Sequence, residues 1–565
     1  MHEKEVARYV RFDNLHFKTM NFNKIDIILE HHLHVPSVLK KQTITQAAVL
    51  ISVLALISKF IGFFREVLIA NYFGATGQTD AFVVAMLIPG SILGLFAGGF
   101  STLVIPFYLE RKSKSEEAAR KFVDSALLVW GSVFVVVSVV ILIFAPTFVH
   151  LIAYGFTGER FELAVRLTRY LVAYGLLNIL VAIFTGLLQA QKQFFLPVAV
   201  SLIGNVAIVL SLFLLHRYLG INSWTVGLTL SSLISFVAMF LVLYRQGFFH
   251  NLSYHGVDWH EIRQFGVLLL PLVISGGISI INQMVDKTIG SSLDAGSIAA
   301  LNFSGRVWQI PLALFAGPIA TAVFPTFSEL ALTDAGKAQY RSRLEQTMSV
   351  SFYVMIPSTF FIFFLSEPIV QLFFERGAFD PKATALTSFV VKMYVLGLFA
   401  HAICPIMSKV FYSFKNTTTP VIISAISVGL NIVLNIVLSK FLGAGGIALA
   451  TSIVMVLSFT LYVILVRKYI NPFSKELLIE VGKTLVSAIP IALICYFALP
   501  YFQNASAASL NTFVILAAKI AIVGLLSVAA FMGFSKLLRM QSYEFFRAYL
   551  RRTLKRSKQN IDANH

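Results

Sequence analysis

The chain has 565 residues, of which 57% are hydrophobic and only 13% carry a charge. Ordinary soluble domains have about 25% charged residues, so this composition excludes an ordinary water-soluble fold and indicates a protein whose solvent is lipid. The net charge of +18 does not indicate nucleic-acid binding, because the cations lie mainly in short loops and at the two chain ends.

Residues 1–43 are polar and of mixed charge, and they lack the short apolar core and cleavage site of a signal peptide. We expect a cytosolic tail here. His31, His32 and His34 could bind a metal ion, but no cysteine or acidic partner stands at ligand spacing. The sequence therefore favours solvated histidines over a metal site.

Apolar runs of about twenty residues then recur from residue 44 to residue 536, and each can cross a hydrocarbon core of roughly 30 Å as a helix. The predicted fold is all-α and polytopic, with about fourteen transmembrane helices. No soluble domain of any size fits between them. The expected spans lie near 44–71, 80–107, 122–145, 163–189, 197–216, 223–244, 264–290, 297–328, 346–372, 384–412, 420–440, 445–466, 480–501 and 512–535.

The loop charges predict the direction of the spans. Loops 72–79 and 502–511 carry no Lys or Arg, whereas the loops after the second and eighth spans and the C-terminal tail are basic. Basic loops stay on the cytosolic side of a membrane. We therefore expect a multi-pass protein of the cytoplasmic membrane with both termini in the cytosol.

An internal repeat predicts the organisation of the helices. The segment LFAGGFSTLVIP at 95–106 reappears as LFAGPIATAVFP at 314–325. The shift takes the second span onto the eighth, an even number of helices, which predicts two lobes of like orientation related by an axis along the membrane normal. The expected parts are the N-terminal tail 1–43, an N-lobe 44–250, a C-lobe 251–470, two further helices in 471–536 and a basic cytosolic tail 537–565.

Ionisable residues inside the spans are candidates for function, because a charge at bilayer depth is costly and usually faces a cavity or a partner. Lys59 lies too deep in its span to reach the cytosolic surface, whereas Arg65 could reach the outer interface. We expect Lys59, Arg65 and Arg306 to form a site for a phosphate or pyrophosphate head group. Asp286 and Lys287 are interpreted as a structural ion pair.

Several motifs together resemble one family. They are SKFIGFFRE at 58–66, FGATGQTDAF at 73–82, ALNFSGRVWQIP at 300–311, FERGAFD at 374–380, FYSFKNTTTP at 411–420 and the pair Asn431 and Asn435. From about residue 44 to 535 the chain resembles the MviN/MurJ family of lipid II flippases, within the superfamily of multidrug and oligosaccharidyl-lipid exporters.

The resemblance implies a two-lobed transporter that moves an undecaprenyl-pyrophosphate-linked sugar from the inner to the outer leaflet by alternating access. It also implies that Arg65, Asp80 and Arg306 belong to a central substrate-binding cavity. Lys59 stands where the family usually has arginine. After Pro89 the family typically has an arginine pair and an AEG element, whereas this chain reads GSILGLFAGG at 90–99. We therefore expect a less cationic cavity, and another polyprenyl-linked surface polysaccharide unit remains an alternative substrate to lipid II.

Two other classes of function remain as alternatives. A cation-coupled drug exporter would favour buried carboxylates, whereas this chain favours buried cations, and a membrane glycosyltransferase would need a larger outer loop with catalytic groups. No nucleotide-binding phosphate loop is present, so we expect a transporter or a scaffold without a cofactor, and not an enzyme. The expected partners are a polyprenyl-pyrophosphate-linked glycan and membrane lipids, with cell-envelope synthesis enzymes as further candidates and no nucleic acid.

Overall fold

The structure is a computed structural model that describes residues 44–249, 257–332, 334–470, 474–502, 510–545 and 547. The predicted tail 1–43, with His31, His32 and His34, lies outside these residues. The chain separates into two compact units, Met1–Ala55 and Leu56–His565. The side-chain contacts and cavities of the described residues belong to the unit Leu56–His565.

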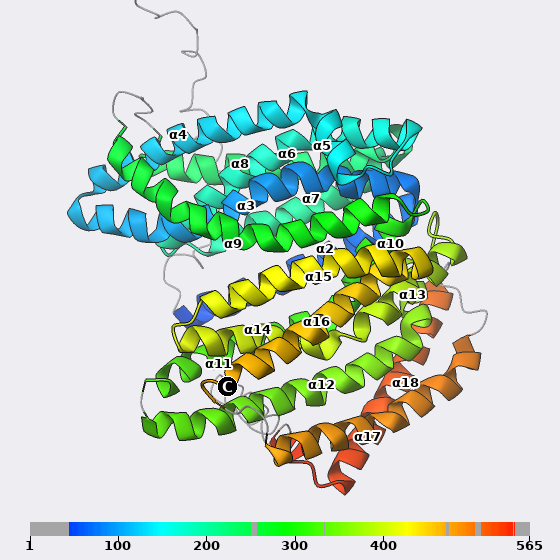
Figure 1. The fold of residues 1–565 in the computed structure, drawn as a ribbon. Coiled ribbons are helices and arrows are strands. Elements are labelled where there is room, and N and C mark those ends of the chain that lie inside the picture. Colours follow the sequence, from blue (N-terminus) through cyan, green and yellow to red (C-terminus); the bar gives the residue numbers. More distant parts are fainter. Residues whose placement is uncertain are drawn as a thin grey trace, which may run out of the picture. The chain divides into compact units, whose positions relative to one another are not determined.

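Every regular element in the described ranges is helical, which confirms the all-α prediction (Figure 1). Inside a bilayer the backbone must satisfy its own polar groups, and an apolar run does so by forming a helix. In chain order the elements are α2 (Ile44–Phe73), α3 (Gly77–Lys114), α4 (Glu116–Ile143), α5 (Ala145–Ile152), α6 (Gly158–Ala190), α7 (Phe195–Leu219), α8 (Asn222–Arg245), α9 (Trp259–Ser291), α10 (Ser297–Pro311), the π-helical turn η3 (Leu312–Ala316), α11 (Gly317–Leu330), α12 (Asp334–Phe374), α13 (Pro381–Val395), α14 (Leu398–Ser413), α15 (Thr418–Leu442), α16 (Ala444–Val466), α17 (Lys475–Ala498), the 3-10 turn η4 (Leu499–Phe502) and α18 (Leu510–Leu537).

The number of membrane spans is close to the predicted one. Among the described residues, eleven helices are long and apolar enough to cross a membrane, and the pair α13 and α14, bent by 45°, brings the number to twelve. The helices α2 and α9 have 30 and 33 residues but are not among them. Both include residues whose side chains are not described. The count of about fourteen therefore stays a prediction.

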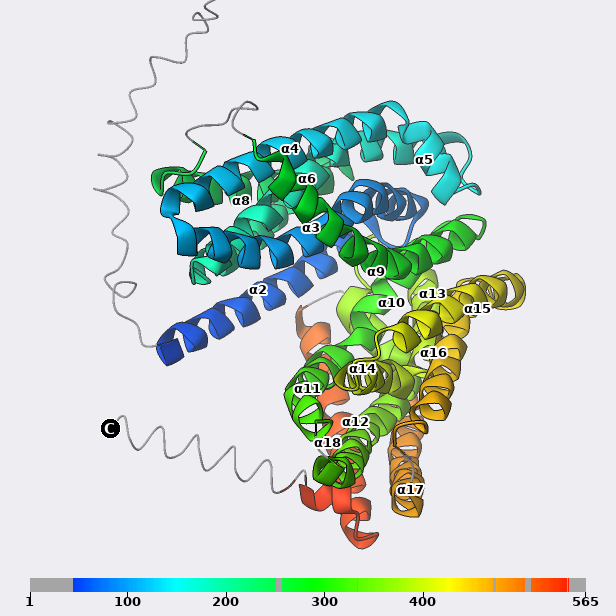
Figure 2. The same cartoon turned by 60° about the vertical axis from the view of Figure 1, so that its left-hand side comes forward.

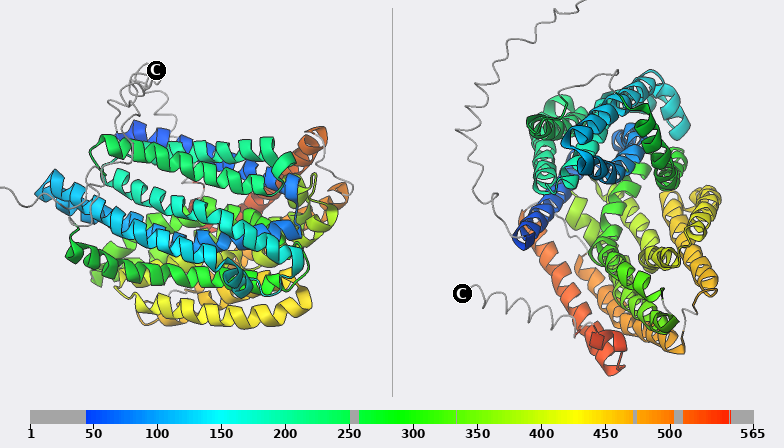
Figure 3. Two further views of the ribbon diagram at one scale, coloured as in Figure 1. Left: turned by 90° about the horizontal axis from the view of Figure 1, so that it is seen from above. Right: turned by 90° about the vertical axis from the view of Figure 1, so that its left-hand side faces the viewer.

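The helices form two groups. In the first, α3 packs against α4 and α6, and α8 packs against α6 and α7. In the second, α16 packs against α13, α14 and α15, while α12 contacts α13, α17 and α18. Figure 3 shows these groups in its right-hand view, and Figure 2 shows α17 and α18 beside α12. The helix α9 contacts α3 in the first group and α15 in the second.

Corresponding turns in the two groups have the same backbone form. The turn before α7 has Lys192 at φ 62° and the turn before α15 has Lys415 at φ 57°. The turns at the other ends of these helices have Gly220 at φ 53° and Gly443 at φ 56°. Both pairs are 223 residues apart. The helix pairs α7–α8 and α15–α16 are therefore built alike, down to the residues with a left-handed backbone.

The two copies of the sequence repeat differ in one respect. The first copy lies inside the unbroken helix α3, whereas the second copy runs through η3 into α11. Pro318 stands where the first copy has Gly99. Proline has no N–H to bond the carbonyl four residues earlier, so the helix is interrupted there.

We name the two ends of the molecule after the residues found there. The glycine end holds the turns of Gly74, Gly296 and Gly377, which lie against one another. The basic end holds the end of α3, where Arg111 contacts Glu261 at the start of α9 with 3.1 Å between Nε and Oε1.

At the basic end, Glu480 of α17 holds the segment that follows α18. Its carboxylate is 6% exposed and accepts hydrogen bonds from Gln541 N at 3.2 Å and from Ser542 N at 3.4 Å. These bonds cap the start of the segment 541–545. We expect Glu480→Ala to destabilise the closed form of this segment by about 1 kcal/mol, so that it opens about fivefold more often. Faster hydrogen exchange in residues 541–545 would show it. Glu476→Ala, on the exposed side of the same helix, should leave the exchange unchanged, and equal rates in the two variants would contradict the assignment.

Candidate functional site

A buried carboxylate joins two of the predicted cations. Glu66 of α2 is 3% exposed, and its Oε1 lies 2.7 Å from Arg65 Nη2 and 3.3 Å from Arg306 Nη2 of α10. The structure thus brings Arg65 and Arg306 together from helices far apart in the sequence. Glu66 was not among the residues predicted for the site, because a neighbour of opposite charge such as Arg65 is common on helix surfaces.

The two arginines differ in how firmly they are held. Arg65 is 21% exposed and donates from Nη1 to Asn205 Oδ1 at 3.1 Å, while Asn205 donates to Ser58 Oγ at 3.1 Å. Arg306 is 46% exposed. Two guanidinium groups therefore share one carboxylate, which leaves an excess positive charge, and the more exposed one can still bind an anion.

Lys59 adds a third positive charge on the same helix. It is exposed and lies seven residues before Glu66, so the two side chains share one face of α2 about 10 Å apart along the axis. We call Lys59, Arg65, Glu66 and Arg306 the cation cluster. Its chemistry suits a diphosphate, since an arginine fork grips two oxygens and lysine adds a point charge.

Asp80, the remaining residue expected at the site, lies in a network of hydrogen bonds within the protein. It is fully buried, and its carboxylate accepts hydrogen bonds from Gly296 N at 2.7 Å, Ala299 N at 2.6 Å and Arg160 Nη2 at 2.5 Å. The carboxylate thus caps the first turn of α10 and ties it to α3 and α6. With these partners Asp80 positions the helix that carries Arg306, and a contact of Asp80 with substrate stays a prediction.

Asp286 also has a partner that the sequence did not indicate. Its Oδ1 accepts a hydrogen bond from Asn435 Nδ2 at 2.7 Å, and Asn435 also donates to Asn431 at 2.8 Å. Asn431 in turn donates to Thr451 at 3.4 Å. Lys287 is near enough to interact electrostatically with Asp286, but the predicted ion pair does not describe this whole network.

The network around Asp286 could hold a small cation, because carboxylate, amide and hydroxyl oxygens are the ligands that hard cations prefer. It joins α9, α15 and α16. Lys287 supplies a positive charge beside the same carboxylate, so the site does not require an ion for its charge balance.

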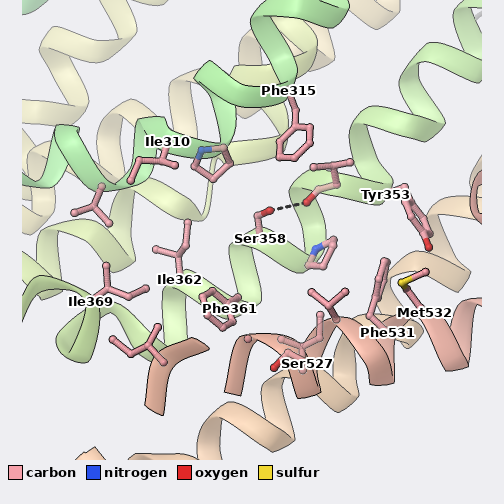
Figure 4. A pocket seen from close by; sticks show the side chains of 18 of the residues that line it. Ile310, Phe315, Tyr353, Ser358, Phe361, Ile362, Ile369, Ser527, Phe531 and Met532 are labelled. Carbon is pink, nitrogen blue, oxygen red and sulfur yellow. Dashed lines mark hydrogen bonds between the residues drawn. The ribbon is translucent and has the colours of Figure 1, made fainter. Parts of the chain in front are cut away.

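An apolar groove lies beside the cation cluster. Its cavity has a volume of about 520 Å³ and lies between α10 with η3, α12, α17 and α18 (Figure 4). Ile310, Phe315, Phe361, Ile362 and Phe531 are among the side chains that point into it. Two hydroxyl groups in the wall have partners within the protein. Ser358 donates to Val354 O at 2.7 Å, and Ser527 Oγ lies 3.8 Å from Cys495 Sγ.

The groove and the cation cluster share one helix. Ile310 lines the groove and lies one turn after Arg306 on the same face of α10. A molecule with an anionic head and a hydrocarbon tail fits such an arrangement. The sequence analysis missed the groove, because an apolar side chain that faces lipid and one that faces a groove give the same pattern.

The altered segment of α3 presents no charge. Leu93 is 1% exposed and belongs to the core, whereas Gly94 and Gly98 are exposed and a Cβ at either position would meet nothing within 4 Å. This part of α3 is therefore open and uncharged where the family typically has cations.

Comparisons with known proteins identify the family to which the chain is similar. A family profile described as "Lipid II flippase MurJ" matches residues 69–517. The chain is 28% identical to the probable lipid II flippase MurJ of Rickettsia prowazekii, over 73% of this chain and 81% of that protein.

Among solved structures, "Lipid II flippase MurJ, inward closed conformation" has a TM-score of 0.72 and 26% identity, covering 89% of this chain and all of that one. An inward-facing multidrug resistance transporter of the MATE family in the MOP superfamily has a TM-score of 0.60 at 15% identity, with 73% of this chain and 94% of that chain covered. The second match concerns the fold alone.

Proposed function

Because the chain belongs to the lipid II flippase MurJ family, we propose that it carries lipid II from the inner to the outer leaflet of the cytoplasmic membrane. The protein is a multi-pass membrane protein of a transporter family. The observation that carries the proposal is the cation cluster, in which Arg65 and Arg306 share the carboxylate of Glu66.

In the proposed mechanism the pyrophosphate of the substrate competes with Glu66 for the guanidinium groups. A diphosphate offers the same bidentate geometry as a carboxylate and carries more charge. Binding therefore changes the contact between α2 and α10, which belong to the proposed N-lobe and C-lobe. Lys59 supplies a positive charge but lacks the planar pair of donors of a guanidinium group, so it holds the head group less specifically.

The groove is proposed to hold the polyprenyl tail. Its wall offers hydrocarbon surface to a hydrocarbon chain, while α10 keeps the head group and the tail about one helical turn apart. The sugar then needs a polar environment only near the cation cluster, which lowers the cost of moving it across the membrane.

We propose that the basic end and both termini face the cytosol, following the distribution of Lys and Arg. The glycine end then faces outward, and substrate enters from the inner leaflet. An inside-negative potential favours the outward movement of an anion by roughly 2.3 kcal/mol per charge for each 100 mV. The lobe boundaries 44–250 and 251–470 and the appended helices in 471–536 belong to the same proposal.

A second substrate has one observation in its favour. The open surface at Gly94 and Gly98 lacks the charges typical of the family, which suits another polyprenyl-linked glycan of lower charge density.

Purified protein in liposomes, with lipid II or an undecaprenyl-linked oligosaccharide, would distinguish the two substrates. Loss of protection from an impermeant reagent reports transport, with and without an imposed potential. Movement of lipid II supports the proposal, and movement of the other glycan alone contradicts it.

Filling the groove should affect transport according to the length of the tail. Gly524 of α18 lines the groove, where a Cβ would lie 3.5 Å from Phe361 Cζ. We expect Gly524→Phe to slow transport of lipid II about tenfold, equivalent to about 1.4 kcal/mol, and to spare an analogue with a short tail. Gly533→Phe is the control, because Gly533 is exposed on the same helix and a Cβ there meets nothing within 4 Å. Equal losses for both tail lengths would contradict the role of the groove.

A further inference from the structure

At the glycine end, the turn after α2 lies directly against the loop between α12 and α13. Ala378 N donates a hydrogen bond to Asn71 O at 2.8 Å. The backbone of Gly74 contacts Ala378 O, and the backbone of Gly377 contacts Asn71 O. The two segments therefore meet mainly through backbone atoms, with the Asn71 side-chain Oδ1 also close to Gly377.

Three glycines are required for this contact, each for two reasons. Gly74, Gly377 and Gly296 have φ values of 61°, 56° and 92°, which disfavour other residues. A Cβ at Gly74 would collide with Ala378 O, one at Gly377 with Asn71 O, and one at Gly296 with Ala75 O. At Gly74 and Gly377 the close approach is between the turn after α2 and the loop before α13. At Gly296 it is between the turn after α2 and the loop before α10.

Other glycines with the same backbone form are a built-in comparison. Gly220 and Gly443 have φ values of 53° and 56°, but a Cβ at either would meet nothing within 4 Å. At Gly220 and Gly443 the tight turn is enough to explain the glycine. At Gly74, Gly296 and Gly377 the close approach of another segment is a second reason for it. The close approach belongs to the contact between the two groups of helices.

The loop 375–380 is held firmly by its own group. Arg376 Nη2 donates to Leu372 O at 2.6 Å, and Asp380 caps α13 by accepting from Ala383 N at 2.7 Å. Phe379 is 1% exposed, with its ring centroid 5.3 Å from that of Phe303. A displacement of α12, α13 or α10 therefore carries the loop with it.

We propose that residues 375–380 are a latch that keeps the glycine end closed. The step that opens this end must break the Asn71–Ala378 hydrogen bond and separate the three glycine turns together. Because the nearest atoms at Gly74 and Gly377 are the backbone carbonyl oxygens of Ala378 and Asn71, an added methyl group cannot be accommodated by a side-chain rotation alone. The inference adds a positioning role for the FERGAFD segment and does not depend on the identity of the substrate.

A disulfide at the neighbouring contact, between the start of α3 and the loop before α10, tests whether the glycine turns must separate together. A Cβ at Gly77 would lie 3.5 Å from Ala295 Cβ, within the range of about 3.5–4.5 Å between the Cβ atoms of a disulfide. In protein with Cys404 and Cys495 replaced by alanine, Gly77→Cys with Ala295→Cys should cross-link under mild oxidation. Transport should then stop and return on reduction, while each single cysteine variant stays active. Equal transport before and after reduction would overturn the proposal.

A second measurement needs no substrate and so remains informative if lipid II is not transported. Ser297, 4% exposed at the start of α10, becomes a reporter as Ser297→Cys in the same background. Adding Gly377→Ala should raise the labelling of this cysteine by an impermeant maleimide about tenfold. Gly443→Ala is the control and should not raise it, because Gly443 has the same φ but a Cβ there meets nothing within 4 Å.

Gly74→Ala repeats the test from the other side of the contact, in case Gly377→Ala does not fold. If both alanine variants label like Gly443→Ala, the glycine turns are structural only and the latch is excluded.

Discussion

Replacing Arg306 with alanine is expected to slow lipid II transport about thirtyfold or more while the protein stays folded in the membrane. A hydrogen bond to a charged group contributes about 1.5 to 3 kcal/mol, and about 2 kcal/mol corresponds to about thirtyfold in rate. The fold should survive, because Glu66 keeps Arg65 at 2.7 Å and Arg306 is 46% exposed. Transport in liposomes and the yield of monodisperse protein would measure the two effects separately.

Two further variants sharpen the test of Arg306. Arg306→Lys keeps the charge and loses the fork, so its rate should lie between those of the wild type and the alanine variant. Arg217→Ala removes an exposed arginine at the end of α7 and should leave transport unchanged. Full transport by Arg306→Ala in well-folded protein would remove the cation cluster from the proposed mechanism.

Much of the fold follows from the sequence because the bilayer limits the alternatives. An apolar run of about twenty residues has only a helix open to it. The depth of Lys59 and Arg306 in such runs was enough to identify them as cavity candidates. Arg65 was ambiguous from depth alone, and its contact with Glu66 places it beside Arg306.

The rest depends on contacts that leave little trace in one sequence. Glu66 follows Arg65 directly, and neighbouring residues of opposite charge are common on helix surfaces, so only the approach of Arg306 reveals its role. Arg160 lies 80 residues from its partner Asp80. The latch is harder still to predict. A contact between backbone atoms requires only a glycine in the sequence, and a glycine such as Gly443 that makes no such contact cannot be told from it.

Replacing Asp80 with alanine is expected to destabilise the protein by about 3 to 5 kcal/mol, the usual cost of breaking a buried ion pair by removing one partner. The variant leaves Arg160, 18% exposed, without its carboxylate, and it leaves two backbone N–H groups of α10 without an acceptor. Unfolding in mild detergent would measure the loss. Asp258→Ala is the control, since Asp258 caps α9 from an exposed position and should cost about 1 kcal/mol.

A double-mutant cycle separates a positioning role for Asp80 from a substrate contact. If Asp80 acts by holding Arg160 and the start of α10, Arg160→Ala should cost much less in the Asp80→Ala background than in the wild type, giving a coupling of about 1 to 3 kcal/mol. If Asp80 instead binds substrate, Asp80→Asn should unfold like the wild type and fail to transport. The geometry favours the first result, because the carboxylate is fully buried and already has three donors. Arg306 then depends on Asp80 for its position, so any loss of transport in Asp80→Ala should accompany the loss of stability.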